Sequence, residues 1–158
     1  MRKRWTRWLS VVLLFLSCCP EKLFDEYKPT PVTGWEKNDT ISFEVPRITE
    51  NGFYGLELGL RTNGAYPFTA ITLIVELTVF PRGNSYKDTI NCELVDQKGK
   101  ELGNGVSYFQ YLFPIRKESL ETGDSLRVNI RHDMKREVLP GISDVGMKVH
   151  RIPTSRTH

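Results

Sequence analysis

Hydrophobic and polar residues alternate along most of the chain beyond residue 38. A period of two places every second side chain on one face of a β-strand, so that one face is buried and the other meets solvent. The segments that show this pattern are 41–45, 56–60, 70–80, 87–94, 126–130 and 144–150. Gly, Pro, Asn and Asp separate them at intervals of about 8–12 residues, without a long stretch of helical period. The pattern therefore predicts an all-β domain.

The longest alternating run, Ala70 to Phe80, is predicted to be a central strand. Its second face is only partly polar, which indicates partial burial on both sides. The first face carries Ile71, Leu73, Val75, Leu77 and Val79. Turn-forming residues follow at 81–85, and 87–94 alternates again, so that a β-hairpin is predicted here.

An aromatic strand is predicted at 106–113 and is expected to end at Pro114. Residues 116–124 read as a polar loop, with a helical turn at 117–121. Altogether we expect about eight strands. They are predicted to pack as an antiparallel β-sandwich of jelly-roll type, with closure into a barrel as the alternative.

The first seventeen residues have the layout of a cleaved lipoprotein signal peptide. Four basic residues precede an apolar run from Trp8 to Leu16, which is about half the roughly 20 residues that span a bilayer. Ser17 supplies a small residue before Cys18. This order predicts export, cleavage after residue 17 and acylation of Cys18 by diacylglycerol and an N-acyl chain.

Cys19 is the alternative acylation site, and an ordinary cleaved signal with two incidental cysteines is a second alternative. Choosing Cys19 would place Leu16 at the apolar position three residues upstream, but Cys18 would then occupy the small-residue position. Several acyl chains, each contributing about 0.8 kcal/mol per buried methylene, would make the attachment permanent. No Asp follows Cys18, so we expect the outer membrane.

Residues 18–38 are predicted to be an extended tether, because three prolines interrupt them and no period appears. Phe24, Tyr27 and Trp35 are unusual in a spacer and are expected to dock on the domain or, alternatively, to face a partner. The division is then a signal peptide at 1–17, a tether at 18–38, a sandwich domain at 39–152 and a tail at 153–158.

The net charge and the cysteines of the mature chain bear on its binding partners and on disulfide formation. Removing the first 17 of 158 residues leaves 141, and the four basic residues lost reduce 22 basic residues to 18 against 19 acidic ones. A net charge near −1 gives no general electrostatic reason to bind nucleic acid or an anionic membrane face. Cys92 alternates with Ile90 and Leu94 and is predicted to point inward, with a disulfide to a leader cysteine as the alternative.

The sequence shows no constellation for catalysis, a metal or a cofactor other than the covalent lipid. His132 and Asp133 are neighbours in a predicted strand, so their side chains should point to opposite faces. Residues 141–146 lack the Gly-x-Ser-x-Gly spacing of a nucleophile elbow. Cys/His spacing for zinc and the Asp-rich loop of a calcium site are also absent from the sequence. We therefore expect a protein that is not an enzyme.

Several short motifs follow one another in a fixed order and cover nearly the whole mature chain. They are Phe24-Asp25-Glu26-Tyr27, Trp35, Asn63-Gly64-Ala65-Tyr66-Pro67-Phe68, Phe80-Pro81, Lys87-Asp88-Thr89 and Gly141-Ile142-Ser143-Asp144-Val145-Gly146. Taken together, these motifs resemble the GldH family of gliding motility lipoproteins from Bacteroidota. The resemblance implies a cell-envelope lipoprotein associated with gliding and with type IX secretion, without catalytic residues.

Two binding functions follow from this interpretation. The first is a part of the motility and secretion machinery that contacts other envelope proteins through an exposed sheet edge or aromatic patch. The second is a glycan-binding surface lipoprotein whose aromatic rings stack on sugars. Aromatic packing inside the sandwich is the competing explanation for the same rings. The candidate contact residues are Trp35, Tyr66, Tyr108 and Tyr111.

Overall fold

A computed structural model describes residues 22–153, and these residues form strands, turns and bends without a helix. The leader cysteines lie outside them. Eight strands have five or more residues: β1 Lys22–Pro29, β3 Ile41–Val45, β4 Gly52–Asn63, β5 Ala70–Phe80, β6 Asn84–Glu93, β8 Tyr108–Leu120, β9 Ser125–His132 and β11 Ile142–Arg151. Three further strands have two residues each: β2 Trp35–Glu36, β7 Asn104–Gly105 and β10 Val138–Leu139.

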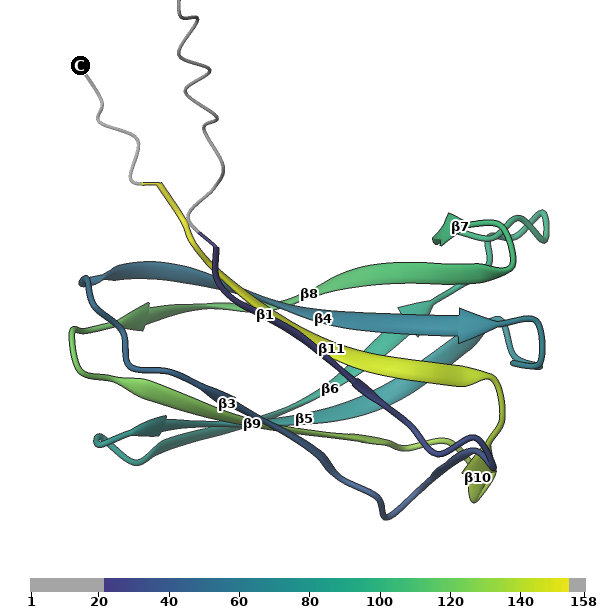
Figure 1. The fold of residues 1–158 in the computed structure, drawn as a ribbon, viewed down its shortest axis with the longest axis horizontal. Helices are drawn as coiled ribbons and strands as arrows, with labels where there is room; N and C mark the ends of the chain where they lie inside the picture. Colours follow the sequence, from purple (N-terminus) through teal and green to yellow (C-terminus); the bar gives the residue numbers. More distant parts are fainter. Residues whose placement is uncertain (1–21, 154–158) are drawn as a thin grey trace, which may run out of the picture.

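The strands form two layers that face each other (Figure 1). One sheet has the order β1-β11-β4-β8-β7 and the other β3-β9-β5-β6, and β10 pairs with β2 at one corner. Every pairing between these strands is antiparallel. The predicted antiparallel sandwich is confirmed.

The strand order is that of a jelly roll. Among the eight long strands, the first pairs with the eighth, the second with the seventh, the third with the sixth and the fourth with the fifth. These pairs alternate between the two sheets. A ribbon of four antiparallel pairs wrapped in this way gives the double-sheet arrangement with two Greek keys.

The core between the layers is built from the inward faces of the alternating runs. β5 lies between β9 and β6, as predicted for a central strand, and its five residues from Ile71 to Val79 on the first face are all buried. Cys92 on the neighbouring β6 also lies in this core, as predicted. Burial of each aliphatic side chain contributes about 1.5–3 kcal/mol, so this layer is the main source of stability.

The structure corrects the predicted tether. Residues 22–29 form β1, which pairs with β11 from Lys22 opposite His150 to Pro29 opposite Asp144. Pro29 fits because β1 is an edge strand and its last residue needs no ladder hydrogen bond. Phe24 packs edge-on against Phe43 of the opposite sheet, with ring centroids 6.4 Å apart. Residues 22–29 therefore belong to the domain, whose predicted start was residue 39.

The aromatic strand is also longer than predicted. β8 passes through Pro114 and ends at Leu120, where the sequence suggested a loop with a helical turn. Leu56 pairs with Arg116 and Glu57 with Pro114, so Ile115 is an extra residue in β8. This β-bulge places the proline without breaking the pairing with β4.

The side chain of Tyr27 in β1 lies on the outer face of the five-stranded sheet. Its ring lies over Gly59 of β4 and Gly146 of β11, where an added Cβ would be only 2.5 and 2.6 Å from the nearest ring or hydroxyl atom. Arg61 covers the other side of the ring, with its guanidinium carbon 3.9 Å from the ring centroid. The absence of side chains at these two glycines thus leaves room for the Tyr27 ring of the first strand.

We predict that Gly59→Ala lowers the free energy of unfolding by about 1–3 kcal/mol, the usual cost of overpacking a filled site. The new methyl group would displace the Tyr27 ring. Gly64→Ala is the matched control, because no atom lies within 4 Å of the position of its added Cβ. Chemical denaturation of both variants measures the difference, and equal stabilities would contradict the role given to Tyr27.

Candidate partner-binding surfaces

His132 is a structural residue of the core. Its ring is fully buried and lies edge-on to Trp35, with centroids 5.3 Å apart. Nδ1 accepts a hydrogen bond from the Met134 amide at 3.4 Å, and Nε2 donates to the Trp35 carbonyl at 3.1 Å. Desolvation lowers the pKa of His132, with a smaller effect of Lys37 in the same direction. The neutral ring therefore holds Trp35 in place.

The remaining reactive groups give no sign of a chemical site. Within residues 22–153, no three His, Cys, Asp or Glu side chains gather in a way that could hold a metal ion. Asp133 is exposed while His132 is buried, as expected for neighbours on opposite faces. Burial raises the pKa of the Cys92 thiol to about 12, which keeps it protonated and unreactive.

The four predicted contact residues divide into buried and exposed ones. Trp35 is fully buried in the core, so its prediction as a partner-facing residue is wrong. Tyr111 is 4% exposed, and its ring forms part of the wall of a hollow described below. The Tyr111 hydroxyl donates to Glu101 at 2.5 Å, and burial raises its pKa to about 12. Tyr66 is half-buried and donates to the Ala70 carbonyl at 2.9 Å. Tyr108 is 63% exposed.

Exposed apolar side chains are concentrated in the segment of the chain around Tyr108. Of the nine large hydrophobic residues that are exposed in the described chain, four lie between positions 102 and 112. Concentrated exposed apolar surface of this kind is typical of a protein interaction site. We call this group the β8 edge patch, and its members are Leu102, Val106, Tyr108 and Leu112.

The patch lies on an open edge of the five-stranded sheet. β7 pairs only with Phe109 and Gln110, and beyond them no described strand pairs with the outer edge of β8. The second half of β8 carries Pro114, the bulge and the cationic Arg116, which are devices that prevent pairing with another chain. In the first half, β7 covers only Phe109 and Gln110, so the edge is open at residues 111–113, beside the patch.

A hollow of about 320 Å³ lies next to the patch. Leu102, Tyr111, Leu112 and Phe113 form its apolar wall, and Glu93, Asn104 and Gln110 complete it. Its volume is at the lower limit of the roughly 300–1,000 Å³ found for ligand sites, which is enough for a few side chains of a partner. The patch, the edge and the hollow thus form one continuous surface.

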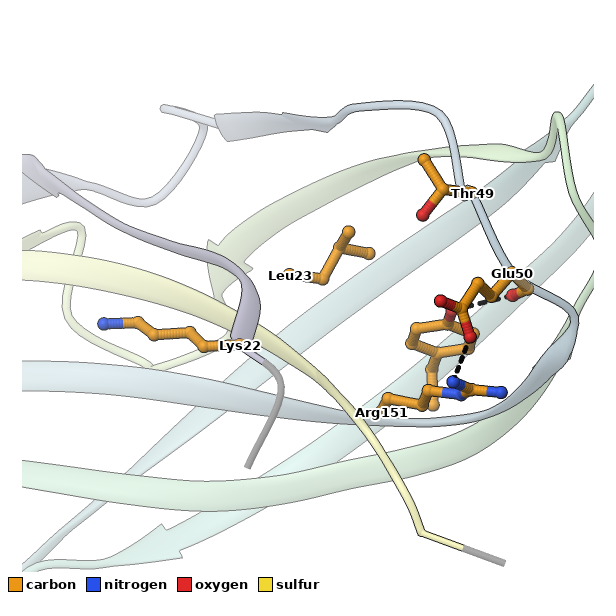
Figure 2. A pocket seen from close by; sticks show the side chains of 6 residues that line it. Lys22, Leu23, Thr49, Glu50 and Arg151 are labelled. Atoms are coloured by element: carbon orange, nitrogen blue, oxygen red, sulfur yellow. Dashed lines mark hydrogen bonds and ion pairs between the residues drawn. The ribbon is translucent and has the colours of Figure 1, made fainter. Parts of the chain in front are cut away.

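A second, smaller pocket lies at the opposite end of the sandwich and is shown in Figure 2. It has a volume of about 170 Å³ and is lined by Lys22, Leu23, Thr49, Glu50, Tyr54 and Arg151. The Tyr54 hydroxyl donates to the Glu50 carbonyl at 2.8 Å, and Arg151 forms an ion pair with the Glu50 carboxylate. Because one water occupies about 30 Å³ of liquid, the pocket has room for a few waters.

Sequence reasoning missed three members of the β8 edge patch. Leu112 could have been found, because Tyr108 and Leu112 have the same parity in a strand and Tyr111 the opposite one. Leu102 and Val106 lie in turns, where no period reports the direction of a side chain. Their exposure follows from the packing of the segment and could not be read from the pattern.

The jelly-roll sandwich, preceded by a leader with the lipoprotein pattern, places the protein in the class of exported all-β lipoproteins. The described residues contain no helix, and therefore no helical segment that could cross a membrane. A family model described as GldH lipoprotein matches residues 22–149. The chain belongs to the GldH lipoprotein family, which confirms the resemblance noted in its sequence.

Two relatives are similar over most of their length. The Gliding motility lipoprotein GldH of Flavobacterium johnsoniae is 30% identical over 150 residues, covering 90% of this chain and 92% of the relative. The Gliding motility lipoprotein GldH homolog of Christiangramia forsetii is 27% identical over 152 residues, with the same coverage. A solved protein of Sulfurospirillum deleyianum, 10% identical, gives a TM-score of 0.43, with 83% of this chain and 99% of that chain covered.

We predict that the protein loses stability as the pH falls below about 6.5, the pKa of an unfolded histidine. The pKa of His132 is lowered in the folded state, so the unfolded chain takes up a proton that the folded chain does not. Thermal unfolding at pH about 7.5 and about 5 measures the effect.

His132→Gln, which keeps an N–H donor for the Trp35 carbonyl, should reduce this pH dependence. His150→Gln on the half-buried sheet surface is the control and should retain it. An unchanged pH dependence in His132→Gln would show that His132 is not its source.

Proposed function

We propose that the protein is a lipid-anchored, non-catalytic component of the gliding motility machinery and of the type IX secretion linked to it, and that it acts by contacting other envelope proteins. The family and the names of both relatives support the motility context. The observation that carries the contact role is the β8 edge patch, with four exposed apolar side chains beside an open strand edge.

The proposed anchor is Cys18, with Cys19 as the alternative, carrying diacylglycerol and an N-acyl chain. The proposed location is the outer membrane. Support comes from the order of basic residues, apolar run, Ser17 and Cys18, and from the family of lipoproteins to which the chain belongs. Several acyl chains hold a protein at a membrane far longer than a single one.

The proposed contact is the addition of an extended partner segment beside β8. Main-chain hydrogen bonds to the open edge near residues 111–113 would give affinity, as in other strand-addition complexes. Apolar side chains of the segment would enter the hollow lined by Leu112 and Phe113, and specificity would come from their fit. A partner with an exposed extended apolar stretch is therefore the kind that suits this surface.

Glycan binding is supported less well. Tyr108 could stack on a sugar ring, but its exposed neighbours Leu102, Val106 and Leu112 offer sugar hydroxyls no hydrogen bonds. Only Glu93, Asn104 and Gln110 of the adjacent hollow would supply polar partners. Trp35 is buried and cannot contribute. A glycan array that binds the wild type but not Tyr108→Ala would favour this second function.

We predict that Leu112→Asp abolishes co-purification of the partner proteins and reduces spreading of a gliding host. The added carboxylate would place a charge against an apolar interface, where desolvation is costly. Val32→Asp is the matched control, because Val32 is fully exposed and lies outside the patch. Affinity capture from detergent-solubilised membranes compares the two. Identical sets of captured proteins would contradict the proposed contact.

We predict that Cys18→Ala leaves the signal peptide uncleaved and the chain without lipid, because the thiolate is the acceptor of the diacylglyceryl group. Cys19→Ser should be processed as the wild type. Mass spectrometry of the amino-terminal peptide distinguishes them. Loss of lipid in Cys19→Ser alone would assign the anchor to Cys19 instead.

A further inference from the structure

The first and last described strands leave the sandwich at the same end. β1 begins at Lys22, β11 ends at Arg151, and Lys22 is paired with His150. Three connections close that end, namely 46–51 between β3 and β4, 81–83 between β5 and β6, and 121–124 between β8 and β9. We call this surface the entry end. The β8 edge patch lies at the opposite end, next to β7 (Figure 1).

Covalent geometry limits how far the entry end can be from the proposed lipid. Cys18 is four residues before Lys22, where β1 begins. An extended chain spans at most about 3.3–3.6 Å per residue, so the lipidated residue is within roughly 14 Å of β1. Acylation of Cys19 would shorten this reach. The sandwich therefore has no long spacer, and its entry end must be close to the lipid headgroups.

The loops of the entry end form a fixed platform. The Ile48 amide donates to the Asp124 carbonyl at 2.7 Å, and the Gly123 amide donates to the Ile48 carbonyl at 2.8 Å. Asp124 is buried, and its carboxylate accepts from Arg82 at 2.5 Å. Two of the three connections thus hold each other through the backbone, and the third is joined to them through Arg82.

The composition of this platform suits a membrane surface. Phe53 and Phe80 expose aromatic rings there, and such rings partition into the interfacial region of a bilayer. The basic side chains at the entry end are Lys22, Arg47, Arg82 and Arg151, and the acidic ones are Asp25, Glu50, Glu121 and Asp124. The two signs balance, with Lys22 paired to Asp25, Arg82 to Glu121 and Asp124, and Arg151 to Glu50, so no net negative charge repels anionic headgroups.

We propose that the sandwich stands end-on upon the membrane, with the entry end against the phospholipid headgroups and the β8 edge patch directed away from them. This inference rests on the proposed acylation. β8 has 13 residues at about 3.3 Å each, so Tyr108 at its start would lie roughly 40 Å from the lipid surface and Leu112 roughly 26 Å. The occupant of the entry end is the bilayer that holds the acyl chains, and partner proteins approach from the opposite end.

Quenching of tryptophan by nitroxide-labelled lipid headgroups tests this orientation. The cleaved chain contains a single tryptophan, Trp35, whose fully buried ring gives a constant background. Phe53→Trp introduces a reporter at the entry end, and Tyr108→Trp introduces one at the β8 edge patch. The two positions are matched, because their side chains are 58% and 63% exposed. The acylated proteins are reconstituted in vesicles of phosphatidylethanolamine and phosphatidylglycerol with and without the nitroxide.

The expected result is strong quenching of Phe53→Trp and emission of Tyr108→Trp that does not change with the nitroxide. Equal quenching of both reporters, or stronger quenching of Tyr108→Trp, in protein that floats with the vesicles would overturn the orientation and leave the anchor intact. Acylated protein that does not float would overturn the anchor and the orientation together. Circular dichroism of both variants verifies that they are folded.

Discussion

The contact on which the architecture depends is that of Tyr27 with the glycines beneath it. Without side chains at Gly59 and Gly146, the ring lies flat across two strands and holds β1 against β11. That pairing is the first of the four strand pairs that make up the jelly roll, and it adds the outermost strand to one sheet. On the same side, Lys28 donates to the Ser42 carbonyl at 2.7 Å and joins the two sheets. This side of the sandwich is therefore closed, whereas the β8 side remains open.

The alternation of side chains was sufficient to predict the central part of the fold. β5, the hairpin to β6 and the inward direction of Cys92 all follow from an uninterrupted period of two. Prediction was wrong in the two strands that contain proline. Pro29 is the last residue of the edge strand β1, and β8 continues beyond Pro114 because Ile115 is an extra residue in a bulge. A bulge depends on the partner strand, and that partner is far away in the sequence, so a local pattern cannot reveal it.

The candidate surface was harder to predict than the fold. Trp35 and Tyr108 are both aromatic residues near turns, yet one is buried and the other exposed. The difference for Trp35 is made by His132, which is 97 residues away in the sequence and binds its carbonyl. Tyr108 stays exposed because β8 is the last long strand of its sheet. The burial of Trp35 and the exposure of Tyr108 thus depend on how the sheets assemble. Composition shows that the chain contains aromatic rings, but not which of them are exposed.

The antiparallel pairing of the first and last strands also determines where the protein can be modified for study. Because β1 starts where β11 ends, a fluorescent protein fused after Pro153 would be attached on the same side as the proposed acyl groups. With the entry end on the membrane as proposed, the fused protein would occupy the space between the sandwich and the lipid. A tag inserted at the exposed turn 97–100, which connects β6 to β7 at the other extremity, would avoid this crowding.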